Sequence, residues 1–220
     1  MKRAGNFMMV LCLAAFTLAL IAGAEEASGA SISRPKELDD VVGSLTETGY
    51  ENKFFNLKVE LEGGWIGVDQ DELDEMNADR LEMLQGINGE YGENLKQYTC
   101  FYADSKEDHA MLSMVVTNAS SLGTLLKADT IIDMSMDELE TAYRMLGVGE
   151  LSTEKITIEF MGEENVPCAY THGTKGGLDI YFAQVFVIED SYLMLVRATV
   201  FLDDNVQTVL DLVQKLDPEA

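Results

Sequence analysis

Two consecutive segments near the end of the chain are apolar on both of their alternating faces. Within residues 178–189 the apolar side chains are Ile180, Phe182 and Phe186 on one face, and Tyr181, Val185 and Val187 on the other. Residues 192–202 show the same pattern. Because successive side chains of a strand point to opposite faces, such strands must be covered on both sides. The chain is therefore expected to form a sheet with a packed layer on each face.

Helices are expected to supply these layers because three amphipathic segments begin with helix-start signals. The signals are Asp69 with Glu72, Ser135 with Glu138, and Asp204 with Gln207. In each pair a capping side chain is followed three positions later by an acid or an amide. The helices are predicted to end near Gln85, Leu146 and Leu216. We therefore predict an α+β fold in which an antiparallel β-sheet is sandwiched between helices.

Alternation and turn signals predict the strands of this sheet. Strands are expected over residues 55–61 and 65–68, followed by a hairpin of residues 97–103 and 109–117. A meander follows, made of residues 155–160, 166–172, 178–189 and 192–202. The short Gly-, Asn- and Asp-containing turns between these segments suit antiparallel neighbours.

Residues 1–24 have the layout of a secretory signal peptide. Lys2 and Arg3 precede an apolar run, and the small-x-small triplet Ala22-Gly23-Ala24 stands before Glu25. We predict cleavage before Glu25, a secreted or extracytoplasmic protein, and no stable membrane span after cleavage. An uncleaved anchor is the alternative, since the apolar run is barely long enough to span a bilayer.

The rest of the chain divides into a tether and one domain. Residues 25–48 are rich in Ser, Gly, Ala and acids, and they are predicted to be a flexible acidic tether. Residues 49–220 are predicted to be a single α+β domain, which is long enough to bury a core.

The chain is strongly acidic, with a formal net charge of −24 that becomes −26 when the two bases of residues 1–24 are removed. Such a field repels nucleic acid and anionic lipid. It attracts cations, so a cell-envelope protein or another basic partner is expected, and calcium is an alternative. The charge also has a simpler explanation, which is that it keeps a secreted protein soluble.

Cysteine and histidine are too sparse to predict a metal centre. Cys100 and Cys168 remain after cleavage, and outside the cytoplasm they either form a disulfide or stay as two buried thiols. A structural zinc site needs four Cys or His ligands at characteristic spacings. Only His109 and His172 could join the two cysteines, and no two of the four have that spacing.

The start of the predicted domain resembles a known family. The residues Tyr50-Glu51-Asn52-Lys53-Phe54-Phe55 and the pair Gly64-Trp65 resemble the opening of PsbP-like domains. The order of predicted elements is also similar, although this chain lacks the proline that often precedes the Gly-Trp pair. The family includes many secreted bacterial proteins. The resemblance implies an α-β-α sandwich that binds other proteins or assists assembly, with no shared catalytic residues.

Catalytic signatures are missing from the sequence. Neither G-x-S-x-G nor H-E-x-x-H occurs, and the two histidines suit ordinary surface positions. Acids are so abundant that paired carboxylates of the glycosidase type cannot be assigned from spacing. The acidic run from Asp69 to Glu75 departs from a calcium loop, because an EF-hand needs Gly at the sixth position and Glu at the twelfth, where Asp74 and Arg80 stand.

Arg80, Arg197 and Trp65 are the candidate binding residues. Arg80 falls near the centre of the apolar stripe of the first helix, and Arg197 shares a strand face with Leu195 and Phe201. A charge in such a place must be paired or reach water past a buried stem. A structural ion pair is one reading, and a polar pocket for an anionic group is the other. Trp65 is either an anchor for a partner or a packing residue.

These observations favour a secreted, non-catalytic binding or accessory domain that uses no cofactor and no metal. The alternatives are an extracellular hydrolase that uses carboxylates and a calcium-dependent envelope protein. Two facing acids in a deep cleft would favour the hydrolase.

Overall fold

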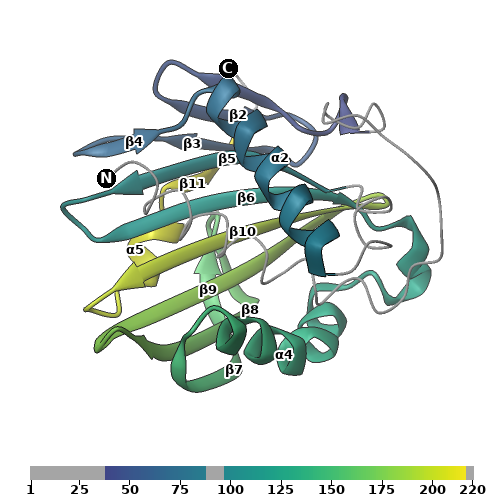
Figure 1. Cartoon of the computed structure of the whole chain (residues 1–220). Helices are drawn as coiled ribbons and strands as arrows, with labels where there is room; N and C mark the ends of the chain where they lie inside the picture. The colour runs from purple at the N-terminus through teal and green to yellow at the C-terminus, as the bar shows by residue number, and fades with distance from the viewer. Residues whose placement is uncertain (1–37, 88–96, 217–220) are drawn as a thin grey trace.

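The computed structural model describes residues 38–87 and 97–216 of the chain (Figure 1). Its helical elements are α2 (Gln70–Ile87), the 3-10 segment η3 (Ser120–Leu125), α4 (Ala128–Met145) and α5 (Val206–Leu210). The strands of the N-terminal part are β1 (Ser44–Thr46), β2 (Gly49–Asn52), β3 (Leu57–Glu60) and β4 (Trp65–Gly67). The others are β5 (Gln97–Ser105), β6 (Ala110–Asn118), β7 (Gly149–Phe160), β8 (Glu163–Lys175), β9 (Leu178–Glu189), β10 (Tyr192–Phe201) and β11 (Val213–Lys215).

The strands form two antiparallel sheets. The larger has seven strands in the order β4-β5-β6-β10-β9-β8-β7, and the smaller has four in the order β1-β2-β3-β11. The centre of the large sheet is occupied by β6, β10 and β9. The strand β9 has the predicted bounds, and β10 ends one residue earlier than predicted. The meander is therefore confirmed, and its strands β7 and β8 are longer than the sequence indicated.

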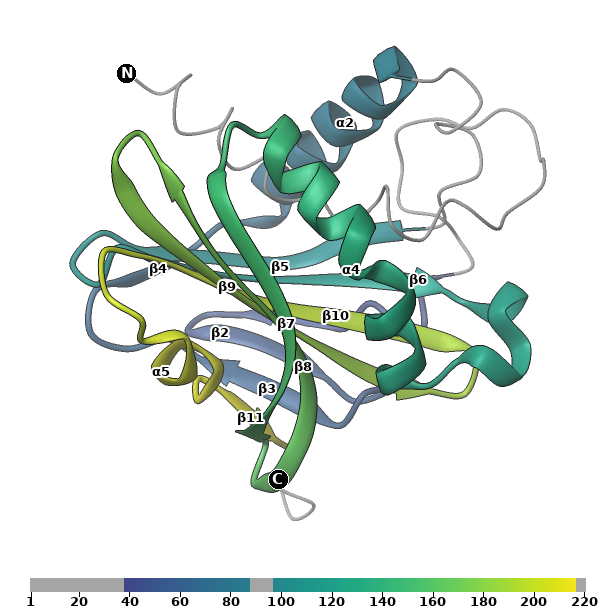
Figure 2. The same ribbon diagram turned by 90° about the horizontal axis from the view of Figure 1, so that it is seen from below.

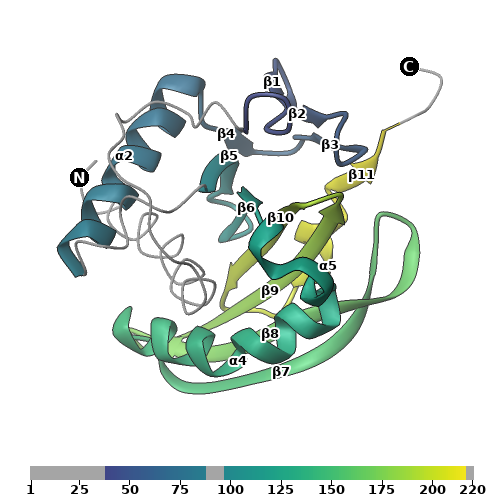
Figure 3. The ribbon, with the colours of Figure 1, turned by 90° about the vertical axis from the view of Figure 1, so that its right-hand side faces the viewer.

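The central strands are apolar on both faces, as predicted, and each face carries its own core. One face of β10 contributes Leu193 and Leu195 to a core with α2 and α4, and Figure 3 shows these helices on the same side of the sheet. The other face contributes Val196 and Val200 to a core with α5 and the small sheet. A layer is needed on both faces because exposing each large apolar side chain would cost about 1.5–3 kcal/mol.

The predicted sandwich between helices is wrong, because helices form the main layer on one face only. The second face is covered largely by β2, β3 and β11 of the small sheet, together with the five-residue helix α5 (Figure 2). Strands make up 51% of the structure and helices 24%. The fold is thus mostly antiparallel β-sheet, and it is not an α-β-α sandwich.

The end of the chain explains much of this difference. The helix predicted up to Leu216 stops at Leu210, and the strand β11 follows and pairs with β3, with Val213 opposite Val59. Val206, Val209 and Val213 are buried, as the apolar pattern predicted. The spacing of these valines is compatible with one long helix, and also with a short helix followed by a strand. Pairing of β11 with β3 decides for the short helix and the strand.

The folded part begins earlier than the predicted boundary at residue 49. Residues 25–37 of the predicted tether lie outside the described residues, but Leu38, Val41 and Val42 are buried and β1 pairs with β2. The amide of Asn52 holds this segment: Nδ2 donates to the Val41 carbonyl oxygen at 2.9 Å. The Tyr50 hydroxyl donates to the carbonyl oxygen of Val42. Residues 38–48 are therefore part of the domain.

The predicted start of α2 is confirmed, whereas the predicted start of α4 is not. Asp69 caps α2, since its Oδ1 accepts from the Glu72 amide at 2.9 Å while Glu72 Oε2 accepts from the Asp69 amide at 3.4 Å. This is the predicted reciprocal pair. By contrast, α4 begins at Ala128, and Ser135 lies inside it with its hydroxyl donating to the Ile132 carbonyl oxygen at 3.2 Å. The predicted start at Ser135 is therefore wrong.

Nothing in the described part of the chain combines the helix length and apolar character needed to cross a membrane. The predicted signal peptide, residues 1–24, lies outside the described residues.

Cys100 and Cys168 are buried thiols that do not form a disulfide with each other. They lie on β5 and β8, which are separated by three intervening strands of the large sheet. At about 4.8 Å between neighbouring strands, this distance is far beyond the reach of a disulfide. Burial raises the pKa of the Cys168 thiol from 9.0 to about 12.

Both thiols are therefore expected to be unreactive in the folded protein. With Cys12 replaced by serine, thiol titration at pH 8 should proceed at least ~100-fold more slowly than in 8 M urea, because the thiolate is the reacting form. Two thiols should then appear on unfolding. A thiol count of zero in reductant-free urea would instead show that the cysteines are bonded.

Candidate functional site

Arg197 lies in the middle of β10, on the face of the large sheet that carries α2 and α4. It stands directly opposite Ser113 of β6 and Gln184 of β9. The residue is only 2% exposed. None of its Nε, Nη1 and Nη2 atoms has a hydrogen-bond partner among the residues that the structure describes. The centre of this face therefore contains a guanidinium with its donors unused.

A buried, unpaired guanidinium destabilises the folded protein. Removing an ion from water costs several kcal/mol, and only close charge partners and hydrogen bonds offset that cost. The ion pairs of the described residues do not involve Arg197. Natural proteins break such local rules mainly at functional or strained sites. Among the described residues, Arg197 is thus the strongest candidate for contact with a ligand.

Arg80 reaches the same face from α2. It is 4% exposed, and the stripe that contains it also buries Leu73 and Met76, as the helical periodicity predicted. Its Nη2 donates to the Gln97 carbonyl oxygen at 2.8 Å and its Nη1 to Thr99 Oγ1 at 3.4 Å. The bonds hold the guanidinium against β5. Among the described residues, a backbone oxygen and a hydroxyl take the place of the carboxylate that a structural ion pair would need.

The two arginines act on each other electrostatically. Burial, and after it the positive charge of Arg197, lower the pKa of Arg80 from 12.5 to about 10. The Arg80 guanidinium therefore stays protonated at neutral pH, although the nearby charge of Arg197 disfavours its own charge. An anion placed near both would relieve this repulsion and the cost of burial together.

Gln184, which stands opposite Arg197, is held in place by a hydrogen bond to Tyr143. Its Nε2 donates to the Tyr143 hydroxyl at 2.5 Å, and Tyr143 is fully buried on α4. The Tyr143 ring stacks on Phe182, with centroids 4.1 Å apart and planes 20° apart. Gln184 is 1% exposed, and its Oε1 has no hydrogen-bond partner in the described part of the chain. The site therefore offers an unused acceptor next to the unused donors.

Sequence reasoning found the arginines and missed the polar residues around them. Gln184 is a single polar residue inside an otherwise apolar strand face, and Ser113 stands between Met111 and Val115 on its face, so these interruptions were the available signal. Two further buried oxygens, Gln97 Oε1 and Thr117 Oγ1, also lack partners among the described residues. Gln97 and Thr117 are register neighbours on β5 and β6. The buried polar groups thus extend across several strands of one sheet face.

The other candidate residues lie elsewhere. Trp65 is partly buried against the core on the opposite face, where the small sheet packs, so it does not join the arginines. His172 stacks on Tyr181, with centroids 4.7 Å apart, and its Nε2 lies 3.2 Å from Asp179 Oδ1. Within residues 38–87 and 97–216, no group of three His, Cys, Asp or Glu side chains is arranged to hold a metal ion.

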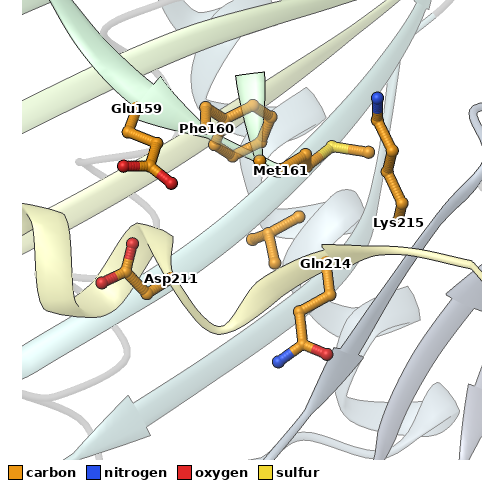
Figure 4. A pocket seen from close by; sticks show the side chains of 8 residues that line it. Glu159, Phe160, Met161, Asp211, Gln214 and Lys215 are labelled. Atoms are coloured by element: carbon orange, nitrogen blue, oxygen red, sulfur yellow. The ribbon is translucent and has the colours of Figure 1, made fainter. Parts of the chain in front are cut away.

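A hollow of about 270 Å³ lies beside the turn between β7 and β8 (Figure 4). Figure 4 shows Glu159 and Asp211 at one end and Lys215 at the other. Gln207 Nε2 donates to the Glu159 carbonyl oxygen at 2.8 Å and to Asp211 Oδ1 at 2.7 Å. Both acids are exposed. Carboxylate hydrolases raise the pKa of one acid in an enclosed cleft, so this solvated pair does not specifically favour that activity.

Comparisons with known proteins add little to this description. No family model matches the chain, and no curated protein matches it. Among solved structures it is similar to PA94, a protein of unknown function from Pseudomonas aeruginosa, at 18% identity and a TM-score of 0.26. The alignment covers 41% of this chain and 58% of that protein, which is less than two thirds of its length. The PsbP-like resemblance therefore stays a prediction.

Proposed function

We propose that this protein is a secreted, non-catalytic binding or accessory domain whose ligand presents an anionic group to Arg197. Arg80 adds a second positive charge from α2. The PsbP-like resemblance and the layout of residues 1–24 support an accessory role outside the cytoplasm. The observation that carries the proposal is the Arg197 guanidinium, which is buried with all three nitrogens unpaired among the described residues.

The chemistry of guanidinium supports an anionic group as the ligand. Its planar set of N–H donors matches the two oxygens of a carboxylate or phosphate, and charge-assisted bonds of this kind are about twice as strong as neutral ones. The strongly negative protein would repel anions at long range. We therefore expect a short-range site that recognises one acidic group, rather than an attractive surface for polyanions.

Arginine side-chain NMR tests the site directly. Acetate and inorganic phosphate, titrated separately at constant ionic strength, should shift the Nε–Hε resonance of Arg197 in a saturable way. Arg197→Met should abolish saturable binding. Arg144→Met is the matched control, because Arg144 lies on the exposed side of α4, and its side chain is 59% exposed. If neither anion shifts the Arg197 resonance at 50 mM, or if Arg197→Met binds as the wild type does, the proposal fails.

Export can be tested separately from binding. Mass spectrometry of the secreted protein is expected to find Glu25 as the first residue. A full-length product retained in the membrane would favour the anchor alternative.

A further inference from the structure

We propose that three partly exposed rings and the acids around them form a docking surface for an arginine-containing basic segment of another protein. The rings belong to Tyr170, Tyr181 and His172, and we call them the aromatic row. Tyr170 and Tyr181 pack against the core on the face of the large sheet that is opposite to Arg197. This docking surface is therefore separate from the anion site, and the inference goes beyond the proposed function.

Strand register and direct ring contacts form the aromatic row. Tyr181 of β9 stands opposite His172 of β8, and Tyr170 lies two residues before His172, on the same face of β8. The rings of His172 and Tyr181 are stacked, with centroids 4.7 Å apart and planes 15° apart. The rings of Tyr170 and Tyr181 are tilted, with centroids 6.5 Å apart. All three residues are half-buried, so the row is supported by the core and still open to solvent.

Four exposed acids surround the aromatic row: Glu154, Asp179, Asp203 and Asp204. At one end, the Tyr170 hydroxyl donates to Asp204 Oδ2 at 2.7 Å. At the other end, Asp179 Oδ1 lies 3.2 Å from His172 Nε2. Glu154 of β7 stands directly opposite Tyr170. The carboxylates therefore lie at both ends of the row and along its side.

The charges of these acids act on the rings and are not balanced by bases nearby. Burial, and after it the charges of Asp179, Asp204 and Asp203, raise the pKa of the Tyr181 hydroxyl. Among the ion pairs of the described residues, none joins one of the four acids to a lysine or an arginine. Ring pairs across strands stabilise a sheet by themselves. That role explains the stacking, but it does not explain the acids placed around the rings.

Ring faces and carboxylates together fit a planar cation. The face of an aromatic ring is negative and attracts a cation. A guanidinium stacks on such a face and also binds carboxylates through paired N–H donors, whereas a lysine ammonium is a strongly hydrated point charge. A second copy of this chain, with a net charge of −24, would add like charge. Within the described residues no three His, Cys, Asp or Glu side chains are arranged to hold a metal ion, so the spread of these acids favours an extended basic segment.

NMR titrations of the full-length protein, at about 150 mM NaCl to screen long-range attraction, test this surface with three probes. The probes are the peptides acetyl-Gly-Arg-Gly-Arg-Gly-amide and acetyl-Gly-Lys-Gly-Lys-Gly-amide, and calcium chloride. The arginine peptide should shift the backbone amides of residues 170–172 and 179–182 in a saturable way. It should bind at least about threefold more tightly than the lysine peptide. Calcium should not compete with it.

Three variants separate the contributions of charge and rings. Asp179→Asn combined with Asp204→Asn keeps the side-chain shapes, and it should weaken binding of the arginine peptide at least about fivefold. Glu189→Gln combined with Asp190→Asn is the matched control, because these exposed acids lie at the other end of β9 and the change in net charge is the same. It should change the affinity less than about twofold. Tyr181→Leu keeps an apolar side chain against the core, and it should abolish the preference for arginine over lysine.

The inference is overturned if the two peptides bind equally and Tyr181→Leu binds as the wild type does, because net charge alone would then explain binding. It is also overturned if both double variants weaken binding to the same extent, or if the arginine peptide gives no saturable shift. Competition by calcium would assign the surface to a divalent cation instead. Melting curves establish that each variant is folded. None of these results bears on Arg197, which the acetate and phosphate titrations test on the other face of the sheet.

Discussion

Replacing Arg197 with methionine is expected to raise the free energy of unfolding by about 1–4 kcal/mol in the absence of ligand. Methionine keeps the buried stem and removes a charge that has no partner among the described residues. Exchanging buried ionic groups for apolar ones of similar volume is often neutral or stabilising by this amount. The same variant is expected to lose anion binding, so stability and function should change in opposite directions.

Urea unfolding of the two proteins, followed by circular dichroism, measures this change. Arg144→Met should alter the free energy of unfolding by less than about 0.5 kcal/mol, as exposed substitutions usually do. A saturating ligand should stabilise the wild type and leave Arg197→Met unaffected. If Arg197→Met lowers the unfolding free energy by more than about 1 kcal/mol, the guanidinium has a structural role and the binding site is wrongly assigned.

The second large effect is expected at Asn52, where alanine should lower the free energy of unfolding by about 2–4 kcal/mol. The side chain is fully buried and holds three groups together. Its Nδ2 reaches the Val41 carbonyl oxygen at 2.9 Å and the Tyr50 hydroxyl at 2.8 Å, and its Oδ1 accepts from the Phe55 amide at 3.0 Å. Alanine would leave buried polar groups unpaired, at about 1–3 kcal/mol each.

Glu51→Ala supplies the control for Asn52, because Glu51 is the preceding residue on β2 and is exposed. It should change stability by less than about 0.5 kcal/mol. Hydrogen exchange should also show that Asn52→Ala loosens residues 38–43 before the rest of the domain. Equal protection of these residues in wild type and variant would contradict the role assigned to Asn52.

The parts of the fold that could be predicted are those fixed by local pattern. The alternation in residues 178–189 gave the bounds of β9 and the need for two packed faces, since both depend only on side-chain direction. The pattern did not determine what covers each face. Val206, Val209 and Val213 are buried in a short helix followed by a strand, and pairing between β3 and β11 over a long sequence distance decides that outcome.

The start of helix α4 could not be predicted from local sequence signals either. Its first residue, Ala128, follows Lys127, which makes no side-chain capping bond, so no signal marked the start. Ser135 offered a stronger signal inside the helix, where its hydroxyl bonds to the preceding turn. The position at which α4 begins is decided by the packing of its whole apolar stripe, which includes Leu139 and Tyr143, and not by a single capping signal.

The sequence was sufficient to predict that Arg80 and Arg197 are buried, but not which groups surround them. Helical phase placed Arg80 in the buried stripe, and strand phase placed Arg197 with Leu195. The partners of Arg80 are a main-chain oxygen and the hydroxyl of Thr99, and an oxygen of the main chain leaves no mark in a sequence. The relation between Arg197 and Gln184 depends on strand register, which is set by the assembled sheet.

The small sheet joins β3, from the first part of the described chain, to β11, from its last part, with Leu57 opposite Lys215. This layer therefore cannot close until β11, far beyond β3 in the sequence, has emerged from a ribosome or through a membrane. Until then, Ala198 and Val200 lack part of the layer that buries them. The core can therefore be completed only late in synthesis or export. Folding depends on contacts between distant parts of the chain, and such contacts make folding slow.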